Sequence, residues 1–499
     1  MKTLATLLAT CQYLELRGSP QTPVEGIAFD SRKLRRGDLF VALSGTNIDG
    51  AKFIGEAVAR GAAAIITEHA IADIGIIPAV RVADARRALS SLAAEFYEHP
   101  SRKAVVIGIT GTKGKTTTTY LLQSILKNHF GRAFRFGTVE YDLWFDRRPA
   151  KNTTPESLDV TALIEEARIN GVHAGVMEVS SHALKTARVE DLHFAAAGFT
   201  NLSLEHTEFH PNMEDYYQTK RHLFFDLLPS GKTAVIAIDD TWGDRLAREC
   251  CERGIPVSTV SLLDHTARIF AQNIEMTGSG SSFIIVAQGL RIPCTIRMPG
   301  AFNVMNALMA AALARSVDID WPAIKAGLES VSNVPGRFET ITNTRGLTVI
   351  IDYAHSPASL ENVLKAVRPI AKGHVLTVFG CGGNRSHEKR PLMGRLAATL
   401  SDVTIVTSDN PRDERPEDIV AEIMAGITPL SVTERGSVKI EIDRRLAIEA
   451  AIEMAKPGDI VLIAGKGHET GQTFAGKILP FDDREVAREF LLKEITSHA

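Results

Sequence analysis

A glycine-rich turn between a strand and a helix carries the clearest chemical signal in the sequence. The run 103–110 is apolar and β-branched, as in a buried parallel strand, and residues 117–130 repeat leucine and isoleucine at helical spacing. Between them lies the segment Gly111-Thr112-Lys113-Gly114-Lys115-Thr116-Thr117. Backbone N–H groups in such a turn and at the start of the helix point at phosphate oxygens. We therefore expect a nucleoside triphosphate site in which Lys115 reaches the β- and γ-phosphates and the Thr116 hydroxyl holds Mg²⁺.

The turn departs from the strict phosphate-loop pattern at one position. The pattern G-x-x-x-x-G-K-[ST] requires glycine at residue 109, where this chain has Ile109 between Gly108 and Gly111. A chance match to a shortened motif is the alternative interpretation. The strand before the turn and the helix after it favour a phosphate loop, because they supply the structural context that the motif needs.

Three further residues could serve a metal ion near this loop. The strand-like run 173–180 ends beside Glu178, whose carboxylate suits Mg²⁺, a cation that prefers oxygen ligands. His206 follows the next strand-like run, 194–203, and on spacing alone a hydrogen-bonded structural histidine is the favoured interpretation. Lys220, taken alone, has the pattern of a surface lysine.

The last third of the chain has the pattern of a doubly wound parallel sheet. Strand-like runs that each lead into a loop with glycine or aspartate lie at 348–355, 374–381, 402–410 and 459–467. Ligands of such sheets bind at the carboxyl ends of the strands, where these loops lie. One loop reads Asp409-Asn410-Pro411-Arg412, in which Asn-Pro on local grounds indicates a turn with Arg412 exposed.

The chain of 499 residues is long enough for several domains. We predict an α/β protein with a small α/β domain over 1–100, a central P-loop domain with a parallel sheet over 101–334, and a Rossmann-like doubly wound domain over 335–499. Other predicted elements are an amphipathic helix within 1–16, strands at 37–43, 63–68 and 232–240, helices at 53–62 and 303–317, and a β-rich stretch at 281–300.

The composition excludes several classes of protein. Hydrophobic residues make up 44% and charged residues 23% of the chain, an ordinary globular balance. The formal net charge of −3 gives no broad field for binding nucleic acid or an anionic membrane. The 5 cysteines are an odd number without metal-ligand spacing, which favours a reducing compartment such as the cytoplasm. Since no apolar run reaches about 18 residues and residues 1–16 lack a secretory cleavage site, neither membrane insertion nor export is expected.

Two segments resemble the Mur ligases, and the first also resembles the folylpolyglutamate synthetases. The segment 110–117 (TGTKGKTT) is similar to their T-G-T-N-G-K-T-T loop, with Lys113 in place of the usual asparagine. The segment 200–220 is similar to the Mur ligase pattern T-N-L-(S/T)-x-D-H-x-D-x-H…Y-x-x-K. Mild departures from that pattern are Glu205, Glu208 and Phe209. The resemblance extends along the whole chain, and it implies the three-domain fold of that family.

The resemblance implies a two-metal site in which Lys220 carries a carboxylate derived from CO₂. His206 would join the second Mg²⁺ site, with Thr116 and Glu178 as the other metal ligands. A lysine beside two Mg²⁺ ions would be repelled by them, which lowers its pKa from about 10.4 and frees the neutral amine that CO₂ requires. The implied catalytic residues are Lys115, Glu178, His206, Lys220 and Arg337.

The resemblance also assigns two groups of binding residues. Those implied for ATP are Gly111, Thr112, Lys113, Gly114, Lys115, Thr116, Thr117, Asn303, Arg337, Asp352 and His355. Those implied for a UDP-sugar peptide are Phe29, Ser31, Thr46, Asn47, Ile48, Asn152, Thr153, Thr154, Ser180, Thr186 and Arg188. Thr186 stands where many relatives have glutamine. Without the family, the residues of the first domain have the pattern of ordinary turns.

The motif D-N-P-R resembles that of family members that add diaminopimelate. The implied amino-acid pocket consists of Arg385, Asp409, Asn410, Pro411, Arg412, Gly465 and Glu469. Diaminopimelate differs from lysine by a distal carboxylate, and an arginine fork binds a carboxylate through two charge-assisted hydrogen bonds. A site built around such a partner can reject a ligand that lacks it by roughly 10⁴-fold. Glu469 would accept the distal amino group.

We therefore expect an ATP-dependent ligase that joins meso-diaminopimelate to the D-glutamate γ-carboxylate of UDP-N-acetylmuramoyl-L-alanyl-D-glutamate through an acyl phosphate. Alternatives within the class are a lysine-adding Mur ligase and a folylpolyglutamate synthetase-like ligase. A P-loop kinase or ATPase that forms no amide bond is the alternative from another class. The expected partners are these small molecules with two Mg²⁺ ions, and the chain is expected to act as a cytoplasmic monomer.

Overall fold

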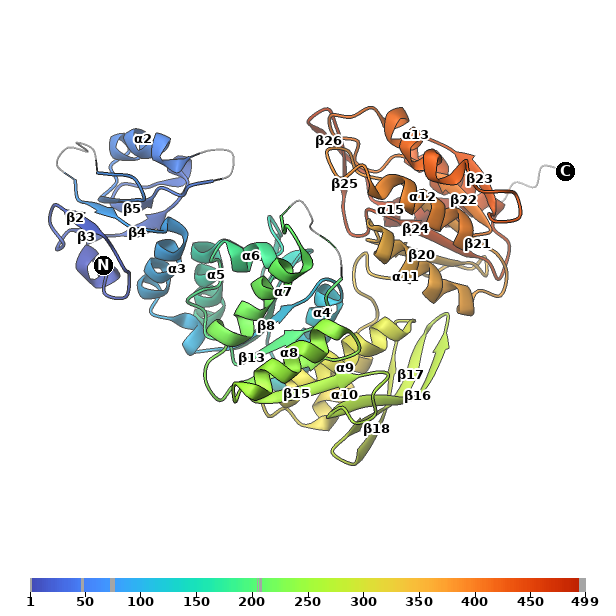
Figure 1. The fold of residues 1–499 in the computed structure, drawn as a ribbon, viewed down its shortest axis with the longest axis horizontal. Coiled ribbons are helices and arrows are strands. Elements are labelled where there is room, and N and C mark those ends of the chain that lie inside the picture. Colours follow the sequence, from blue (N-terminus) through green and yellow to red (C-terminus); the bar gives the residue numbers. More distant parts are fainter. Residues whose placement is uncertain (1, 46–48, 72–76, 204, 206–208, 493–499) are drawn as a thin grey trace. The chain divides into compact units, whose positions relative to one another are not determined.

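The computed structural model describes residues 2–45, 49–71, 77–203, 205 and 209–492. The chain forms two compact units, whose helices and strands are labelled in Figure 1. The first comprises Met1–Phe270 with Leu308–Gly327, and the second comprises Ala271–Ala307 with Leu328–Ala499. Among the described residues, no helix is both long and apolar enough to cross a membrane.

The first unit begins with a five-stranded sheet. Its strand order is β2 (Glu15–Arg17), β7 (Ala79–Arg81), β6 (Ala64–Thr67), β5 (Asp38–Val41) and β4 (Gly26–Ala28). Only β2 is antiparallel to its neighbour. The other elements here are β1 (Lys2–Thr3), β3 (Pro23–Val24), α1 (Leu4–Leu7), α2 (Ile54–Ala59), α3 (Ala85–Phe96) and the 3₁₀ turns η1 (Ser31–Lys33), η2 (Gly50–Phe53) and η3 (Pro100–Arg102).

These elements confirm the predicted strands at 37–43 and 63–68 and the helix at 53–62. The predicted first helix is largely wrong, because helix is confined to Leu4–Leu7 and residues 15–17 form β2. Leu4 and Leu7 are fully buried, and the chain then turns to bring β2 alongside β7. Pairing with the sheet therefore outweighs the weak local preference for helix.

A larger sheet in the first unit carries the phosphate loop. Its order is β11 (Arg147–Pro149), β10 (Glu140–Asp142), β9 (Phe134–Phe136), β12 (Ala174–Glu178), β8 (Val105–Thr110), β13 (Ala196–Phe199), β14 (Thr233–Ala237), β15 (Val257–Ser261), β16 (Ile269–Thr277), β17 (Gly280–Ala287) and β18 (Leu290–Ile296), and from Ala271 onward these strands belong to the second unit. The strands from β9 through β16 are parallel in this order. The accompanying helices are α4 (Lys115–Phe130), α5 (Ser157–Ile169), α6 (Ser181–Lys185), α7 (Met213–His222), the π-helical turn η4 (Leu223–Leu227) and α8 (Thr241–Glu252).

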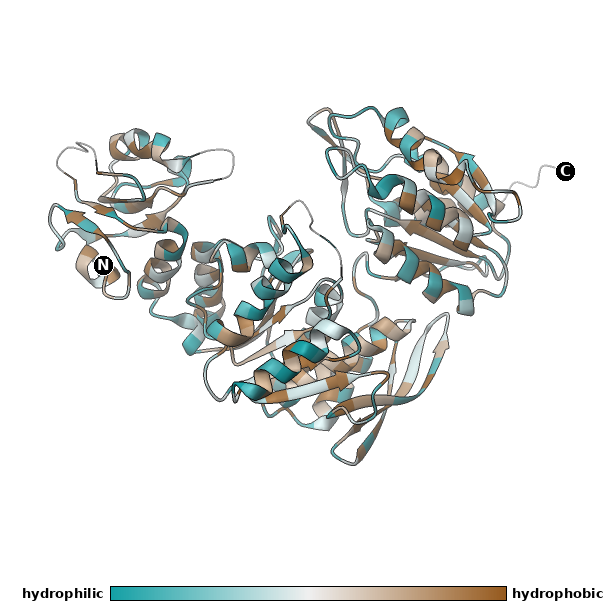
Figure 2. Ribbon diagram, in the orientation of Figure 1, coloured by the Kyte–Doolittle hydropathy of each residue, from teal (hydrophilic) through white to brown (hydrophobic). Residues whose placement is uncertain are grey.

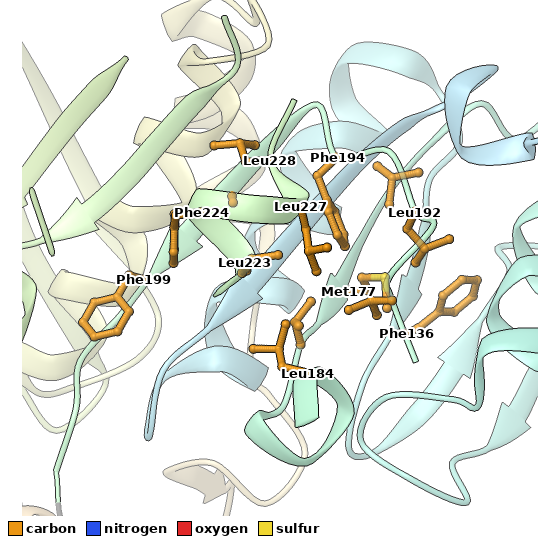
Figure 3. Close-up of a cluster of buried hydrophobic side chains, with 14 of the residues drawn as sticks. Phe136, Met177, Leu184, Leu192, Phe194, Phe199, Leu223, Phe224, Leu227 and Leu228 are labelled. Carbon is orange, nitrogen blue, oxygen red and sulfur yellow. The ribbon is translucent and has the colours of Figure 1, made fainter. Parts of the chain in front are cut away.

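The predicted strands at 103–110, 173–180, 194–203 and 232–240 are confirmed as β8, β12, β13 and β14. Side chains of β9, β12, α6 and η4 gather into one buried cluster beside the sheet, which includes Phe136, Met177, Leu184 and Leu223 (Figure 3). Burial of these side chains removes a large apolar area from water, which holds the ends of β8 and β12 in place.

The second unit contains the antiparallel hairpin of β17 (Gly280–Ala287) and β18 (Leu290–Ile296) and a six-stranded sheet. The sheet order is β19 (Glu339–Ile341), β20 (Thr348–Asp352), β24 (Ile460–Ala464), β21 (Val375–Phe379), β22 (Val403–Val406) and β23 (Ser437–Ile440), with all strands but β19 parallel. Helices α9 (Ala301–Arg315) and α10 (Trp321–Ser330) each have residues in both units, because Leu308–Gly327 belongs to the first. The remaining elements of the second unit are α11 (Pro357–Val367), η5 (Arg368–Ile370), α12 (Lys389–Leu400), α13 (Pro416–Ile427), α14 (Arg444–Met454), the hairpin β25 (Gly471–Phe474) and β26 (Lys477–Pro480), and α15 (Asp483–Leu492).

The β-rich stretch, the helix at 303–317 and the doubly wound sheet of the last third are all confirmed. Figure 2 shows hydrophobic colour concentrated in the strands of the second unit, while α12 and α13 carry both colours. Core clusters cover both sides of this sheet, as expected where helices pack on each face. Its strands β20, β21, β22 and β24 all end in the loops that contain the predicted binding residues.

Candidate active site

The phosphate loop is shaped by two glycines with positive φ. Gly111 has φ 141° and Gly114 has φ 84°. A Cβ atom at residue 111 would lie 1.9 Å from the Thr200 hydroxyl oxygen, so a side chain there would collide with the loop's support. The segment after β13 provides that support. The Thr112 N–H donates to the Asn201 carbonyl (2.9 Å) and the Thr200 hydroxyl donates to the Lys113 carbonyl (2.6 Å).

Ile109 is compatible with a phosphate loop because residue 109 still belongs to β8. Its side chain is fully buried, and it is paired with Glu178 on one side and Gly198 on the other. The backbone leaves the strand only after Thr110. Buried β-branched residues are common in central parallel strands, so Ile109 fits β8 and leaves the loop that follows Thr110 unchanged.

Lys115 and Thr116 open helix α4. The Lys115 ammonium folds back and donates to the carbonyl oxygens of Gly111 and Thr112, each at 2.8 Å. Thr116 is buried at the same helix start. The helix N-terminus, the loop backbone and the lysine therefore provide positive partial and full charge around one point, which suits a phosphate group.

Glu178 ends β12, beside the end of β8. Its side chain is 1% exposed and accepts hydrogen bonds from the Thr138 N–H (2.9 Å) and the Thr138 hydroxyl (3.1 Å). Thr138 was not predicted from the sequence, because no local pattern links a residue after β9 with a carboxylate on β12. These two bonds fix the orientation of the Glu178 carboxylate at the strand end beside β8.

Lys220 lies on α7 and is 1% exposed, so the interpretation as a surface lysine is wrong. Its ammonium donates to the Gly111 carbonyl at 3.0 Å, makes a weaker contact with the Thr110 hydroxyl at 3.4 Å and lies 4.7 Å from the centre of the Tyr216 ring. Burial and then the nearby Lys115 charge hold the pKa of Lys220 well below its usual value of 10.5, against a smaller opposing effect of Glu205. The structure thus brings Lys220 to the phosphate loop, in surroundings that disfavour its charged form.

The residues predicted for a sugar peptide in the central domain lie around Glu178. The Thr154 hydroxyl donates to the Glu178 carbonyl (2.8 Å), the Ser180 N–H donates to that hydroxyl (3.1 Å), and Arg188 donates to the Thr154 carbonyl (3.0 Å). The Thr153 hydroxyl lies 3.1 Å from that of Thr138.

Three more residues of this predicted group make local contacts. The Asn152 N–H donates to the Tyr141 hydroxyl at 3.1 Å. The Thr186 hydroxyl donates to the His182 carbonyl at 2.7 Å, within the end of α6. In the N-terminal sheet region, the Ser31 hydroxyl donates to Glu56 at 2.8 Å, and Phe29 is half-buried. His206, Thr46, Asn47 and Ile48 lie outside the described residues.

The second unit contains the other residues predicted for ATP. The Arg337 guanidinium lies 4.8 Å from the centre of the Tyr353 ring, and the Asp352 carboxylate accepts from the Phe338 N–H at 2.7 Å. The Nδ1 atom of His355 forms a hydrogen bond with the Tyr353 carbonyl at 2.7 Å. Burial raises the pKa of Tyr353 to about 12. Asn303 is buried and donates to the Pro299 carbonyl at 2.7 Å.

The D-N-P-R segment follows β22 and lies against the loop after β24. Asp409 and Asn410 are buried, and the Asn410 amide donates to Glu469 at 2.7 Å. A Cβ atom at Gly465, where φ is 115°, would lie 2.6 Å from the Asp409 carboxylate. Arg412 is half-buried rather than fully exposed. Its φ of 55° confirms a tight turn there.

The loop after β21 approaches the same segment. The Arg412 guanidinium donates to the Gly383 carbonyl at 2.6 Å. A Cβ atom at Gly382 would lie 2.9 Å from that guanidinium and 3.9 Å from Cγ of Arg385. The predicted pocket residues of the second unit therefore gather at the carboxyl ends of β21, β22 and β24.

The β25–β26 hairpin is a part of this pocket that sequence reasoning missed. The Thr473 N–H donates to the Asn410 side-chain oxygen (3.0 Å), and the Arg412 N–H donates to the Thr473 carbonyl (2.9 Å). The Ala475 N–H returns a bond to the Arg412 carbonyl (2.6 Å). Strand-like pairing of residue 412 with Phe474 thus fixes the backbone of D-N-P-R. The signal that could have revealed the hairpin is the two-residue connection Ala475-Gly476, in which glycine suits a tight turn between two short strands.

Family models match three parts of the chain. Residues 23–97 match the Mur ligase family catalytic domain, residues 109–314 the Mur ligase middle domain, and residues 336–467 the Mur ligase glutamate ligase domain. The chain belongs to the Mur ligase family.

Individual relatives extend over nearly the whole chain. UDP-N-acetylmuramoyl-L-alanyl-D-glutamate–2,6-diaminopimelate ligase of Gloeobacter violaceus is 43% identical over 96% of each chain. The ligase of the same name from Streptomyces coelicolor is 42% identical over 94% of this chain and 93% of its own. A solved structure of a ligase of that name has a TM-score of 0.70 at 30% identity and 98% coverage of both chains. MurF from Acinetobacter baumannii, at 21% identity and a TM-score of 0.68, shares the fold.

Proposed function

We propose that the protein is the ATP-dependent ligase that adds meso-diaminopimelate to UDP-N-acetylmuramoyl-L-alanyl-D-glutamate in peptidoglycan synthesis. The single observation that carries the choice of amino acid is the pocket in which Arg412, Asn410 and Glu469 meet at the ends of three strands. An arginine fork suits the distal carboxylate of diaminopimelate, and a carboxylate suits its distal ammonium. Relatives at about 40% identity carry the name of this ligase.

The reaction requires that a poor electrophile be activated. Transfer of the ATP γ-phosphoryl to the D-glutamate γ-carboxylate gives an acyl phosphate and ADP. The neutral amine of diaminopimelate then attacks the acyl carbon, and the tetrahedral intermediate loses phosphate while the nitrogen gives up a proton. Lys115 and Arg337 offset the negative charge of the phosphoryl group, so the protein acts mainly by positioning and electrostatics.

Lys220 serves this chemistry as a carbamate. Its neutral amine attacks CO₂, an N–C bond forms and one proton leaves the nitrogen, so a cationic side chain becomes an oxygen ligand. Thr116 and Glu178 already offer oxygens, whereas unmodified Lys220 offers Mg²⁺ only a nitrogen that repels it when protonated. With His206, these residues would hold two Mg²⁺ ions, whose charge stabilises phosphoryl transfer.

The proposed function also assigns a set of binding residues to each substrate. The phosphate loop with Asn303, Arg337, Asp352 and His355 binds ATP. The UDP-sugar peptide is bound by Phe29, Ser31, Thr46, Asn47, Ile48, Asn152, Thr153, Thr154, Ser180, Thr186 and Arg188, and diaminopimelate by Arg385, Asp409, Asn410, Pro411, Arg412, Gly465 and Glu469. We place the domain boundaries after residues 100 and 334, and we assign the protein to the cytoplasm as a monomer.

Phosphate release under omission of single substrates tests the proposal. The protein is incubated with ATP, Mg²⁺, the UDP-muramoyl dipeptide and either meso-diaminopimelate or L-lysine. Release that needs both the dipeptide and diaminopimelate supports the proposed function. Release with L-lysine in place of diaminopimelate would indicate a lysine-adding ligase, and release with neither the dipeptide nor an amino acid would indicate an ATPase.

A further inference from the structure

Lys466 is a buried cation that none of the steps above uses. Its side chain has no exposed surface and follows the end of β24. The ammonium donates to the Gly471 carbonyl at 2.6 Å, to Glu469 Oε2 at 3.1 Å and to Asn410 Oδ1 at 3.2 Å. A lysine ammonium has three N–H groups, so every donor of Lys466 is engaged.

These contacts determine which way the Asn410 amide faces. Its Oδ1 accepts from the Lys466 ammonium and from the Thr473 N–H at 3.0 Å. An amide nitrogen cannot accept such bonds, so the reversed orientation would leave two buried donors facing an NH₂ group. The Nδ2 group must therefore face Glu469, to which it donates at 2.7 Å.

The same contacts determine how Glu469 is presented. Both the Asn410 amide and the Lys466 ammonium donate to Oε2, and the Glu469 side chain is 31% exposed. The described bonds leave Oε1 as the carboxylate atom available to a ligand. A carboxylate held in this way can receive an ammonium group without first reorganising, which lowers the cost of binding.

We propose that Lys466 is a positioning residue that sets amino-acid specificity, because it holds Asn410 and Glu469 in the arrangement that receives the distal ammonium of the incoming diamino acid. This inference rests on the proposed function for the choice of ligand. The positive charge of Lys466 also offsets the negative charge of Glu469, so this carboxylate is not an uncompensated anion before the amino acid binds.

A purely structural role for Lys466 predicts different results. Lys466→Met removes one partner of a buried pair and takes a donor from Glu469, Asn410 and Gly471, so the unfolding temperature should fall whichever role Lys466 has. A purely structural role predicts that the binding of all three substrates weakens in parallel or not at all, whereas a positioning role predicts weaker binding of the amino acid alone. The pattern of the KM values therefore separates the two roles.

The test is a set of KM measurements on the full-length protein with Lys466→Met. The KM for meso-diaminopimelate should rise about 10- to 100-fold, the range for lost hydrogen bonds to a charged group. The KM values for ATP and the UDP-muramoyl dipeptide should stay within about two-fold, since their predicted residues make no use of Lys466. Lys372→Met, at an exposed lysine between η5 and β21, is the matched control and should change none of the three.

Unchanged KM for the amino acid, or a parallel rise in all three KM values, would overturn the inference. If Lys466→Met does not fold, Lys466→Gln keeps a donor without the charge and should raise the same KM by a smaller factor. The wild-type protein separates the two proposals. Should it use L-lysine in preference to diaminopimelate, the proposed function fails, and the inference about Lys466 is then decided by the KM for L-lysine.

Discussion

Lys220 in the first unit and Lys466 in the second are both buried lysines beside a strand end, yet their surroundings differ. Lys466 forms an ion pair with Glu469 at 3.1 Å and satisfies its other donors with Asn410 and Gly471. Among the described residues, the acceptors of Lys220 are the uncharged oxygens of Thr110 and Gly111. Lys115 adds a like charge nearby, and the pKa of Lys220 is lowered well below 10.5.

The difference shows how one residue type serves two purposes. A buried lysine paired with a carboxylate keeps its neighbours in a fixed arrangement, because the pair and its hydrogen bonds are lost together. A buried lysine without such a carboxylate favours its neutral form, which is the nucleophile that reacts with CO₂. Position in the fold therefore decides between a rigid support and a reactive amine.

Lys220→Ala should have the largest effect on activity, because it removes the buried amine of the first unit. It should lower kcat about 10³-fold or more, because it removes a metal ligand and the charge that stabilises phosphoryl transfer. Phosphate release measures the loss, and a short carboxylic acid added at millimolar concentration should restore part of the activity. Full activity of Lys220→Ala without added acid would contradict the carbamate role.

Arg412→Met tests the pocket of the second unit. It should lower kcat/KM for meso-diaminopimelate about 10²- to 10⁴-fold, since the distal carboxylate loses its charged partner. Use of L-lysine should change far less, so the preference for diaminopimelate nearly disappears. Arg415→Met is the control, because that side chain is 75% exposed on the same loop. Equal losses with both amino acids would show that Arg412 does not read the distal carboxylate.

Lys220→Met tests the lowered pKa of Lys220 through the pH dependence of the stability of the protein. The pKa of Lys220 in the folded protein is below its unfolded value of 10.5, so the unfolded chain binds more protons between those two values. The stability of the wild type therefore rises with pH in that window and falls as pH decreases, whereas this contribution is absent in Lys220→Met.

In buffer free of CO₂, Lys220→Met should melt a few degrees above the wild type at pH 7, and the gap should shrink at higher pH, by about 1.4 kcal/mol per pH unit at most. Calorimetry at pH 7 and pH 9 measures both effects. A gap that stays constant between pH 7 and pH 9 would mean that Lys220 remains cationic in the folded protein and would contradict its lowered pKa.

Thr138→Val should have the smallest effect. It removes the hydroxyl bond to Glu178 but leaves the backbone N–H bond, so the Mg²⁺ concentration needed for half-maximal activity should rise about ten-fold or less. Thr161→Val, which removes a buried hydroxyl bond within α5, is the control. A larger change in the KM for diaminopimelate than in the Mg²⁺ requirement would contradict the role of Thr138.

Sequence patterns predicted the central strands of both large sheets, because buried parallel strands are continuous apolar runs that end in polar loops. The outer strands, such as β10, β11, β19 and β23, were not predicted. The patterns also did not predict that β24 lies between β20 and β21, since the chain crosses more than a hundred residues before β24 adds to the sheet. That order brings the loop with Lys466 and Glu469 next to the D-N-P-R segment. The residue types therefore predicted the candidate binding side chains, whereas the strand order determines which side chains lie next to them.

The local reading of Lys220 as a surface residue failed for a related reason. Helix α7 is rich in charged residues, and only its packing against the phosphate loop buries that one side chain. The family resemblance selected Lys220 from its motif alone. Burial and then the nearby Lys115 charge give the physical reason for its lowered pKa, which the proposed reaction with CO₂ requires.

Competition between two amino acids in one reaction tests the central claim most directly. The protein is given ATP, Mg²⁺ and the UDP-muramoyl dipeptide with equal concentrations of meso-diaminopimelate and L-lysine, and the products are separated by mass spectrometry. We predict a UDP-muramoyl tripeptide whose mass exceeds that of the dipeptide by diaminopimelate less one water, with the lysine product below detection. A dominant lysine product, or ATP hydrolysis with no tripeptide, would contradict the assignment.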